Sequence, residues 1–132
     1  PSGYELSINA TTSPALQSAY DSFEDYTPAG AVPDYNFISP TDTSYFGFTP
    51  EGSDVALFYR DQDFSCGAGT NETTGKCWDG LSITPKIIAV SSAPNHPSGS
   101  TTTARFRAET GEGHIQTAGE YQVVIEVTAI SL

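Results

Sequence analysis

Apolar and polar residues alternate along several stretches of this chain, which is the period of a strand with one buried face. The alternation is clear in Tyr4–Asn9 and in Thr102–Glu109. In the second stretch Ala104, Phe106 and Ala108 share one face, and Thr103, Arg105 and Arg107 share the other. Shorter stretches rich in residues that suit strands are Thr43–Phe48, Val55–Tyr59, Leu81–Ile83 and Lys86–Val90.

The closing segment, Gly119–Ile130, carries the longest strand pattern. Its second face mixes the apolar Val124 and Ile130 with polar residues, so both faces contain apolar side chains. We therefore expect this strand to be buried in the core. Its first face carries Tyr121, Val123, Ile125, Val127 and Ala129.

The remaining segments predict short elements separated by Gly and Pro turns. Ser13–Tyr20 predicts one or two helical turns, with Ser13 as the N-cap and Pro14 in the first position. Short strands are expected around Tyr35–Ile38. Because no helix alternates with the strands, the fold class is all-β. We predict one antiparallel β-sandwich over residues 1–132, immunoglobulin-like or jelly-roll-like, with long loops and one loop closed by a disulfide.

The charge of the chain excludes two classes of partner. Asp and Glu number 16 against 5 Lys and Arg, which gives a formal net charge of −11. Such a field repels nucleic-acid phosphates and anionic lipid. No apolar stretch is long enough to span a membrane as a helix, so no membrane insertion is expected.

Cys66 and Cys77 frame a segment rich in Gly, Thr and Asn. No histidine lies near them, so a disulfide is the economical interpretation and a zinc site lacks ligands. Disulfides persist in oxidising compartments, and we therefore expect an extracellular or cell-surface location. The sequons at Asn9 and Asn71 are candidate glycosylation sites.

Candidate chemistry is sparse. No Ser or Cys stands in a nucleophile-elbow motif, and His96 and His114 fall in loop or turn contexts, so we expect neither an enzyme nor a cofactor. Asp61 and Asp63 form a weak calcium candidate, because the rest of a twelve-residue calcium loop is missing. Trp78, Tyr26 and Tyr35 are candidates for stacking on a sugar ring; the alternative is that these rings belong to the core.

Three short motifs carry a resemblance to a known group. They are Ser2-Gly3-Tyr4-Glu5-Leu6-Ser7-Ile8, Tyr45-Phe46-Gly47-Phe48 and Ala118-Gly119-Glu120-Tyr121. They resemble uncharacterised secreted β-sandwich domains of bacterial surface proteins. The resemblance implies architecture and location only, since that group has no established catalytic residues. It also implies a strand before the Gly-Tyr strand, which this chain lacks, so that the sandwich lacks or exchanges an N-terminal strand.

Two functions remain open. The first is a structural subunit of a surface filament, pilus or surface layer, assembled with itself or with other surface proteins through β-strand complementation. The donor would be Tyr4–Asn9 or Tyr121–Ile130. The second is a carbohydrate- or ligand-binding adhesin module of a larger secreted protein. The residues assigned to strand exchange are Tyr4, Leu6, Ile8, Tyr121, Val123, Ile125 and Val127.

Overall fold

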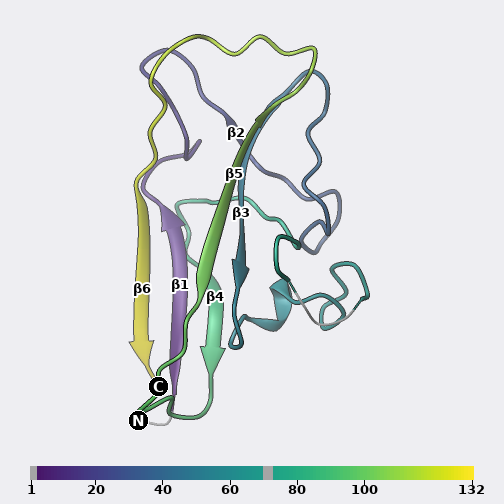
Figure 1. Cartoon of the computed structure of the whole chain (residues 1–132). Coiled ribbons are helices and arrows are strands. Elements are labelled where there is room, and N and C mark those ends of the chain that lie inside the picture. Colours follow the sequence, from purple (N-terminus) through teal and green to yellow (C-terminus); the bar gives the residue numbers. More distant parts are fainter. Residues whose placement is uncertain (1–2, 70–72) are drawn as a thin grey trace.

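The computed structural model describes residues 3–69 and 73–132, and its strands form two three-stranded sheets (Figure 1). Within these residues there is no α-helix, and the single helical turn is the 3-10 turn η1, Leu57–Tyr59. No helix in the described part of the chain has the length and apolar character needed to cross a bilayer. The predicted all-β sandwich is confirmed. Its strands are β1 (Tyr4–Ala10), β2 (Glu24–Asp25), β3 (Ser44–Glu51), β4 (Lys86–Ser91), β5 (Thr103–Thr110) and β6 (Ile125–Ser131).

Each sheet is built around one central strand. In the first, which we call the β1 sheet, the order is β4-β1-β6 and both pairings are antiparallel. In the second, the β3 sheet, the order is β2-β3-β5, with β5 antiparallel and β2 parallel to β3. The first strand of the chain therefore lies between the fourth and the last.

The core lies between the two sheets and follows from the alternation of their central strands. Ile8 and Ala10 of β1 are each 1% exposed, while Phe48 of β3 is fully buried. On β1 the inward residues alternate with the half-exposed Ser7 and Asn9, as the period of two requires, whereas Gly47 and Thr49, on the other face of β3, are also buried. The buried apolar cluster also contains Ala15, Leu16, Phe46, Val55, Ala56, Tyr59, Leu81 and Ile88.

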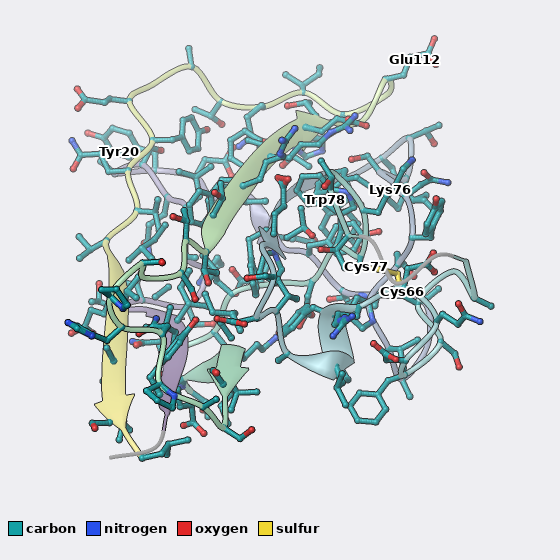
Figure 2. All side chains as sticks on the ribbon, turned by 60° about the horizontal axis from the view of Figure 1, so that its bottom comes forward. Tyr20, Cys66, Lys76, Cys77, Trp78 and Glu112 are labelled. Atoms are coloured by element: carbon teal, nitrogen blue, oxygen red, sulfur yellow. A yellow bond between two sulfur atoms is a disulfide. The ribbon has the colours of Figure 1, made fainter. Side chains whose placement is uncertain are left out.

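One side of the sandwich is closed by backbone pairing. Val55, which follows β3, forms a bridge with Ala89 of β4, and the Ala56 N–H donates to the Ile88 carbonyl at 2.9 Å. On the opposite side β5 pairs only with β3, and β6 pairs only with β1. Figure 2 shows β6 (yellow) and β5 (green) well separated across the molecule. We call this the open side.

The prediction that Gly119–Ile130 is buried in the core is wrong. Only Ile125–Ser131 is a regular strand, and it is an edge strand. Val127 is 59% exposed and Ile130 is 49% exposed. An alternating sequence shows that a strand has an apolar face, but it does not show whether another element covers that face.

Four smaller predictions also fail. Val55–Tyr59 is a single bridge followed by the 3-10 turn, and neither Leu81–Ile83 nor Tyr35–Ile38 forms a strand. Ser13–Tyr20 is not helical, because Gln17 instead exchanges backbone hydrogen bonds with Gln122. The strands expected near Tyr4–Asn9, Thr43–Phe48, Lys86–Val90 and Thr102–Glu109 are confirmed.

The connection from β5 to β6 is tied to the rest of the chain by Asp21. Its carboxylate accepts hydrogen bonds from the Thr117 N–H at 3.0 Å, from the Ser22 N–H at 2.8 Å and from the Gln116 side-chain amide at 2.9 Å. The backbone bond from Thr117 has the largest effect on the carboxyl, and the bond from Ser22 follows. Together they hold the pKa of the Asp21 carboxyl below its usual range. The charged form is the one that fixes the connection.

We expect acid or Asp21→Asn to loosen this connection. Because the pKa of Asp21 is lowered in the fold, its contribution is present above the pKa of the unfolded chain, about 4, and is lost as the pH falls through the lower folded value. The measurement is amide hydrogen exchange at Thr117 and Tyr121. Asp42→Asn, which removes one charge from an exposed loop position, is the control and should leave that exchange unchanged.

Candidate functional site

The residues predicted to take part in strand exchange gather around β1. Tyr4, Leu6 and Ile8 lie on its inner face, and Ile8 is paired with Val127 of β6. Ile125 is paired with Ala10 one step further along the ladder. Tyr121 and Val123 precede β6 and pack against the same core. All seven residues are thus brought together, and their role in exchange remains a prediction.

β1 lies between β4 and β6, and it is the link between these two strands within the β1 sheet. We call the position that it fills the slot. Its pairs with β6 run from Tyr4–Ser131 to Ala10–Ile125, and its pairs with β4 run from Tyr4–Ser91 to Ile8–Lys86. β4 and β6 do not pair with each other. The hydroxyl of Tyr4 donates to the Asp54 carboxylate at 2.6 Å, and burial together with that carboxylate raises the pKa of Tyr4.

Apolar side chains on the open side face the interior but are not covered. Phe106 of β5 is opposite Phe48, and its ring stacks on Phe46 with 6.0 Å between centroids, yet it is 40% exposed. On β6 the inward-facing Val127 is exposed as well. The sequence placed Phe106 on an apolar face, but it did not show that this face is left partly exposed.

The predicted disulfide between Cys66 and Cys77 is present (Figure 2). The stacking platform predicted beside it is wrong for two of its three rings, because Trp78 is 4% exposed and Tyr26 is 3% exposed. Both pack with Phe37, so they belong to the interior. Tyr35 is 39% exposed and lies under the Lys76 ammonium, 4.8 Å from its ring centroid.

The two carboxylates of the calcium candidate have other partners. Asp61 is 1% exposed, and its Oδ1 accepts hydrogen bonds from the N–H groups of Gly67 at 2.8 Å and Gly69 at 2.9 Å. Asp63 forms an ion pair with Arg60 at 3.1 Å. Among the described residues no three His, Cys, Asp or Glu side chains group in a way that could hold a metal ion.

The two sequons differ in what can be described. Asn9 lies on the outer face of β1, and its side-chain amide donates to Glu126 Oε1 at 3.1 Å. Asn71 lies outside the described residues. Glycosylation at either position remains a prediction.

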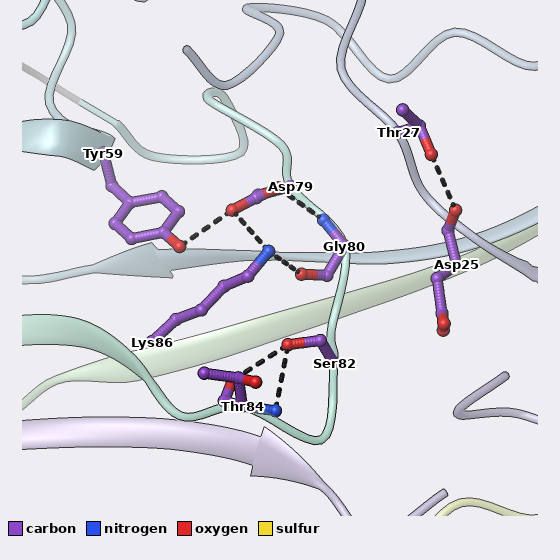
Figure 3. Close-up of polar contacts among 8 residues, drawn as sticks. All are labelled: Asp25, Thr27, Tyr59, Asp79, Gly80, Ser82, Thr84 and Lys86. Atoms are coloured by element: carbon purple, nitrogen blue, oxygen red, sulfur yellow. Dashed lines mark hydrogen bonds and ion pairs between the residues drawn. The ribbon is translucent and has the colours of Figure 1, made fainter. Parts of the chain in front are cut away.

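A polar cluster of Tyr59, Asp79 and Lys86 joins the two sheets on the closed side (Figure 3). Asp79 Oδ2 accepts the Tyr59 hydroxyl at 2.9 Å and the Lys86 ammonium at 3.1 Å, while that ammonium also donates to the Gly80 carbonyl at 2.6 Å. Burial, and then the negative charge of Asp79, raises the pKa of Tyr59. Asp79 bridges to β3 and Lys86 begins β4, so the cluster ties one sheet to the other.

Sequence reasoning missed this cluster because of an irregularity in β4. The register with β1 shifts between Leu6 and Ser7, so that Ile88 and Ala89 are both buried. This shift turns Ile87 outward and Lys86 inward, which simple alternation from Ala89 would not give.

A pocket of about 510 Å³ lies beside the cluster, and its lining includes Pro28, Val32, Phe58 and Ile87.

We expect Tyr59→Phe to lower the free energy of unfolding by about 1–2 kcal/mol, because a buried hydrogen bond to a charged group is lost. Since the folded pKa of Tyr59 is raised, its contribution is complete below the unfolded value of about 10 and declines as the pH rises beyond it. Denaturant unfolding of both proteins at neutral and alkaline pH measures this difference. Tyr20→Phe is the control, since Tyr20 is 91% exposed. Equal stabilities of the two variants would contradict the expected role of Tyr59.

We also expect the double change Cys66→Ala and Cys77→Ala to lower the free energy of unfolding by about 2–3 kcal/mol, because the unfolded chain gains loop entropy. Thermal unfolding with and without a reducing agent measures the same effect in the unaltered protein. If reduction left the melting temperature unchanged, the disulfide would have no stabilising role.

Comparison with known proteins returned no relative for this arrangement. No family model, no curated protein and no solved structure matches the chain. Its function is therefore argued from the geometry of β1, the open side and the disulfide.

Proposed function

We propose that this chain is a structural subunit of an extracellular filament, pilus or surface layer, whose copies are joined by exchange of β1. The observation that carries the proposal is the position of β1: within residues 3–69 and 73–132 it is the only strand paired with β4 and with β6. The slot that it fills accepts the same strand from a neighbouring copy.

Exchange of β1 keeps the ladders and core contacts of the strand itself, whereas the Thr11 N–H bond to the Val124 carbonyl lies in the connection that opens. A neighbour's β1 places Leu6, Ile8 and Ala10 against the same core and forms the same two ladders. Only the connection after β1 has to open, and its residues Thr11, Thr12 and Ser13 are exposed. Domain swapping of this kind has a low energetic cost, and a head-to-tail swap that does not close continues into a fibre.

β1 is a better donor than the second candidate, Tyr121–Ile130. Exchange of that segment would carry the β6 ladder with β1, the Gln17–Gln122 bridge and the partly buried Tyr121, Val123 and Ile125. β1 joins its acceptor through two ladders and contributes the almost fully buried Ile8. The larger contact supports the assignment of the N-terminal strand as donor.

An extracellular location is supported by the disulfide between Cys66 and Cys77, because such bonds are rare in reducing compartments. The alternative function, a carbohydrate-binding adhesin module, required exposed and coplanar aromatic rings. The burial of Trp78 and Tyr26 removes that basis. We therefore place assembly first.

Exchange can be tested with a cysteine pair across the β1–β6 ladder. Ser7 and Thr128 are directly paired, so Ser7→Cys with Thr128→Cys brings two thiols within reach of a disulfide. In exchanged copies the bond links different chains, and non-reducing electrophoresis of protein oxidised at high concentration should show a ladder of covalent multimers. Electron microscopy of the same sample should show filaments or ordered arrays.

The control pair is Glu51→Cys with Thr103→Cys, which joins β3 to β5 and lies outside the exchanged strand. It should form bonds within one chain only. If the Ser7–Thr128 pair also gave only monomers at high concentration, and sedimentation found no larger species, exchange of β1 would be rejected.

A further inference from the structure

We infer that the pocket beside the Tyr59–Asp79–Lys86 cluster binds a small, neutral aromatic compound that carries one carbonyl oxygen, such as an aromatic ketone or ester. The volume of this pocket, about 510 Å³, lies within the range of about 300–1,000 Å³ that small-molecule sites occupy. Its lining comes from the loop residues 28–32, from η1, from Asp79 and from the start of β4, and no described residue of β1 contributes to it. The site is therefore separate from the slot, and it goes beyond the proposed exchange of β1.

The walls of the pocket are apolar. The side chains that form them are Pro28, Ala31, Val32, Phe58, Pro85 and Ile87. Phe58 is 37% exposed and Ile87 is 45% exposed, so part of this apolar surface faces water in the free subunit. A ligand with an apolar body removes that surface from water. An aromatic body also makes offset or edge-to-face contacts with the ring of Phe58.

Internal contacts hold both walls of the pocket in place. The loop wall is fixed through Asp34, whose carboxylate accepts the Ala29 N–H at 3.1 Å and the Tyr26 hydroxyl at 2.6 Å. On the other wall the ring of Phe58 packs edge-on against Tyr59, with 5.1 Å between the ring centroids. A site that is formed before the ligand arrives binds it without the cost of ordering the walls.

The cluster supplies one hydrogen-bond donor for a ligand. An ammonium group has three N–H donors. That of Lys86 donates to Asp79 Oδ2 at 3.1 Å and to the Gly80 carbonyl at 2.6 Å, and no acceptor within residues 3–69 and 73–132 bonds its third hydrogen (Figure 3). The Lys86 side chain is 33% exposed, so a ligand can reach it. A carbonyl oxygen is the acceptor that completes this set.

The charges of the cluster favour a neutral ligand. Lys86 and Asp79 form an ion pair, so together they carry no net charge. A carboxylate ligand would meet the Asp79 carboxylate in a chain of net charge −11, and an amine would meet the Lys86 ammonium. The many hydroxyls of a sugar would lie against apolar walls without partners, which costs free energy. The ligand class is therefore aromatic and neutral, with a single acceptor oxygen.

The test compares three probes of similar size on the unaltered protein. Acetophenone is a neutral aromatic ketone, ethylbenzene lacks its oxygen, and benzoate is an anion. Titration followed by amide chemical shifts should move the signals of Val32, Phe58 and Ile87, with a dissociation constant for acetophenone on the order of 1 mM. Ethylbenzene should bind about tenfold more weakly, because a hydrogen bond to a charged group is lost, and benzoate should bind at least as weakly as ethylbenzene.

Each result of these titrations decides the proposal. If acetophenone left the signals of the pocket residues unchanged, the site would be rejected. Ethylbenzene or benzoate binding as tightly as acetophenone would reject the assigned class of ligand. None of these outcomes bears on exchange of β1, which is tested by the cysteine pairs.

A substitution in the wall locates the binding site. Ile87→Asp places a charge in the apolar lining and should weaken binding of acetophenone by about tenfold or more. Val90→Asp is the matched control, because Val90 is 42% exposed on the same strand and does not line the pocket. Equal binding by these two variants would overturn the assignment of the pocket.

A substitution of the donor tests the role of Lys86. Lys86→Met keeps an unbranched apolar stem and removes the ammonium, so acetophenone should lose its advantage and bind no more tightly than ethylbenzene. This ratio of two affinities is not changed by a general loss of stability, and circular dichroism shows whether the variant is folded. Lys76→Met, which removes a cation bonded to Asn36 outside the pocket lining, should keep the ratio of the unaltered protein. A ratio that Lys86→Met leaves unchanged would show that the ammonium does not bind the ligand.

Discussion

The fold depends above all on the two hydrogen-bonded ladders of β1. One ladder joins β1 to the whole length of β6, and the other joins β1 to β4. β4 and β6 do not pair with each other. Without β1 the first sheet does not exist as a sheet, and Ile88 of β4 loses the strand that aligns it over the core. β6 takes its position from this strand, while β4 is held both by β1 and by its backbone bonds to Asp54 and Ala56.

The two sides of the sandwich then have opposite characters. On the closed side, backbone bridges and the Tyr59–Asp79–Lys86 cluster join the sheets. On the open side the connection from β5 to β6 packs against the segment between β1 and β2, through the Gln17–Gln122 bridge and the hydrogen bonds of Asp21. The exposed apolar side chains Phe106 and Val127 therefore lie on one side of the sandwich.

The sequence predicted a large part of this architecture because alternation is a local property. It located β1, β3, β4 and β5 and placed Ala104, Phe106 and Ala108 on one face, as the ladder with β3 confirms. It failed where the outcome depends on distant residues. Ser13–Tyr20 has a helical pattern, but the backbone bonds of Gln17 go to Gln122, more than a hundred positions away.

The candidate site shows the same division. The disulfide was predictable from two cysteines, and the apolar residues of β1 and β6 were predictable from their period. Whether another element covers those residues could not be predicted, because it depends on which strand becomes an edge of its sheet. The inward turn of Lys86 was not predictable either, since it arises from one shift of register opposite Leu6 and Ser7. The burial of Trp78 required the packing of Phe37, which has no local signal.

The pairing of Tyr4 with Ser131 also governs the order in which the subunit can fold. β1 precedes its partner β6 by more than a hundred residues, so a long loop has to close before this ladder forms. Contacts of such high sequence separation form late and slowly. During that interval β1 is without its final neighbour, and at high local concentration a completed slot on another molecule competes for it. The local protein concentration relative to the rate of folding would then set how often β1 closes within its own molecule.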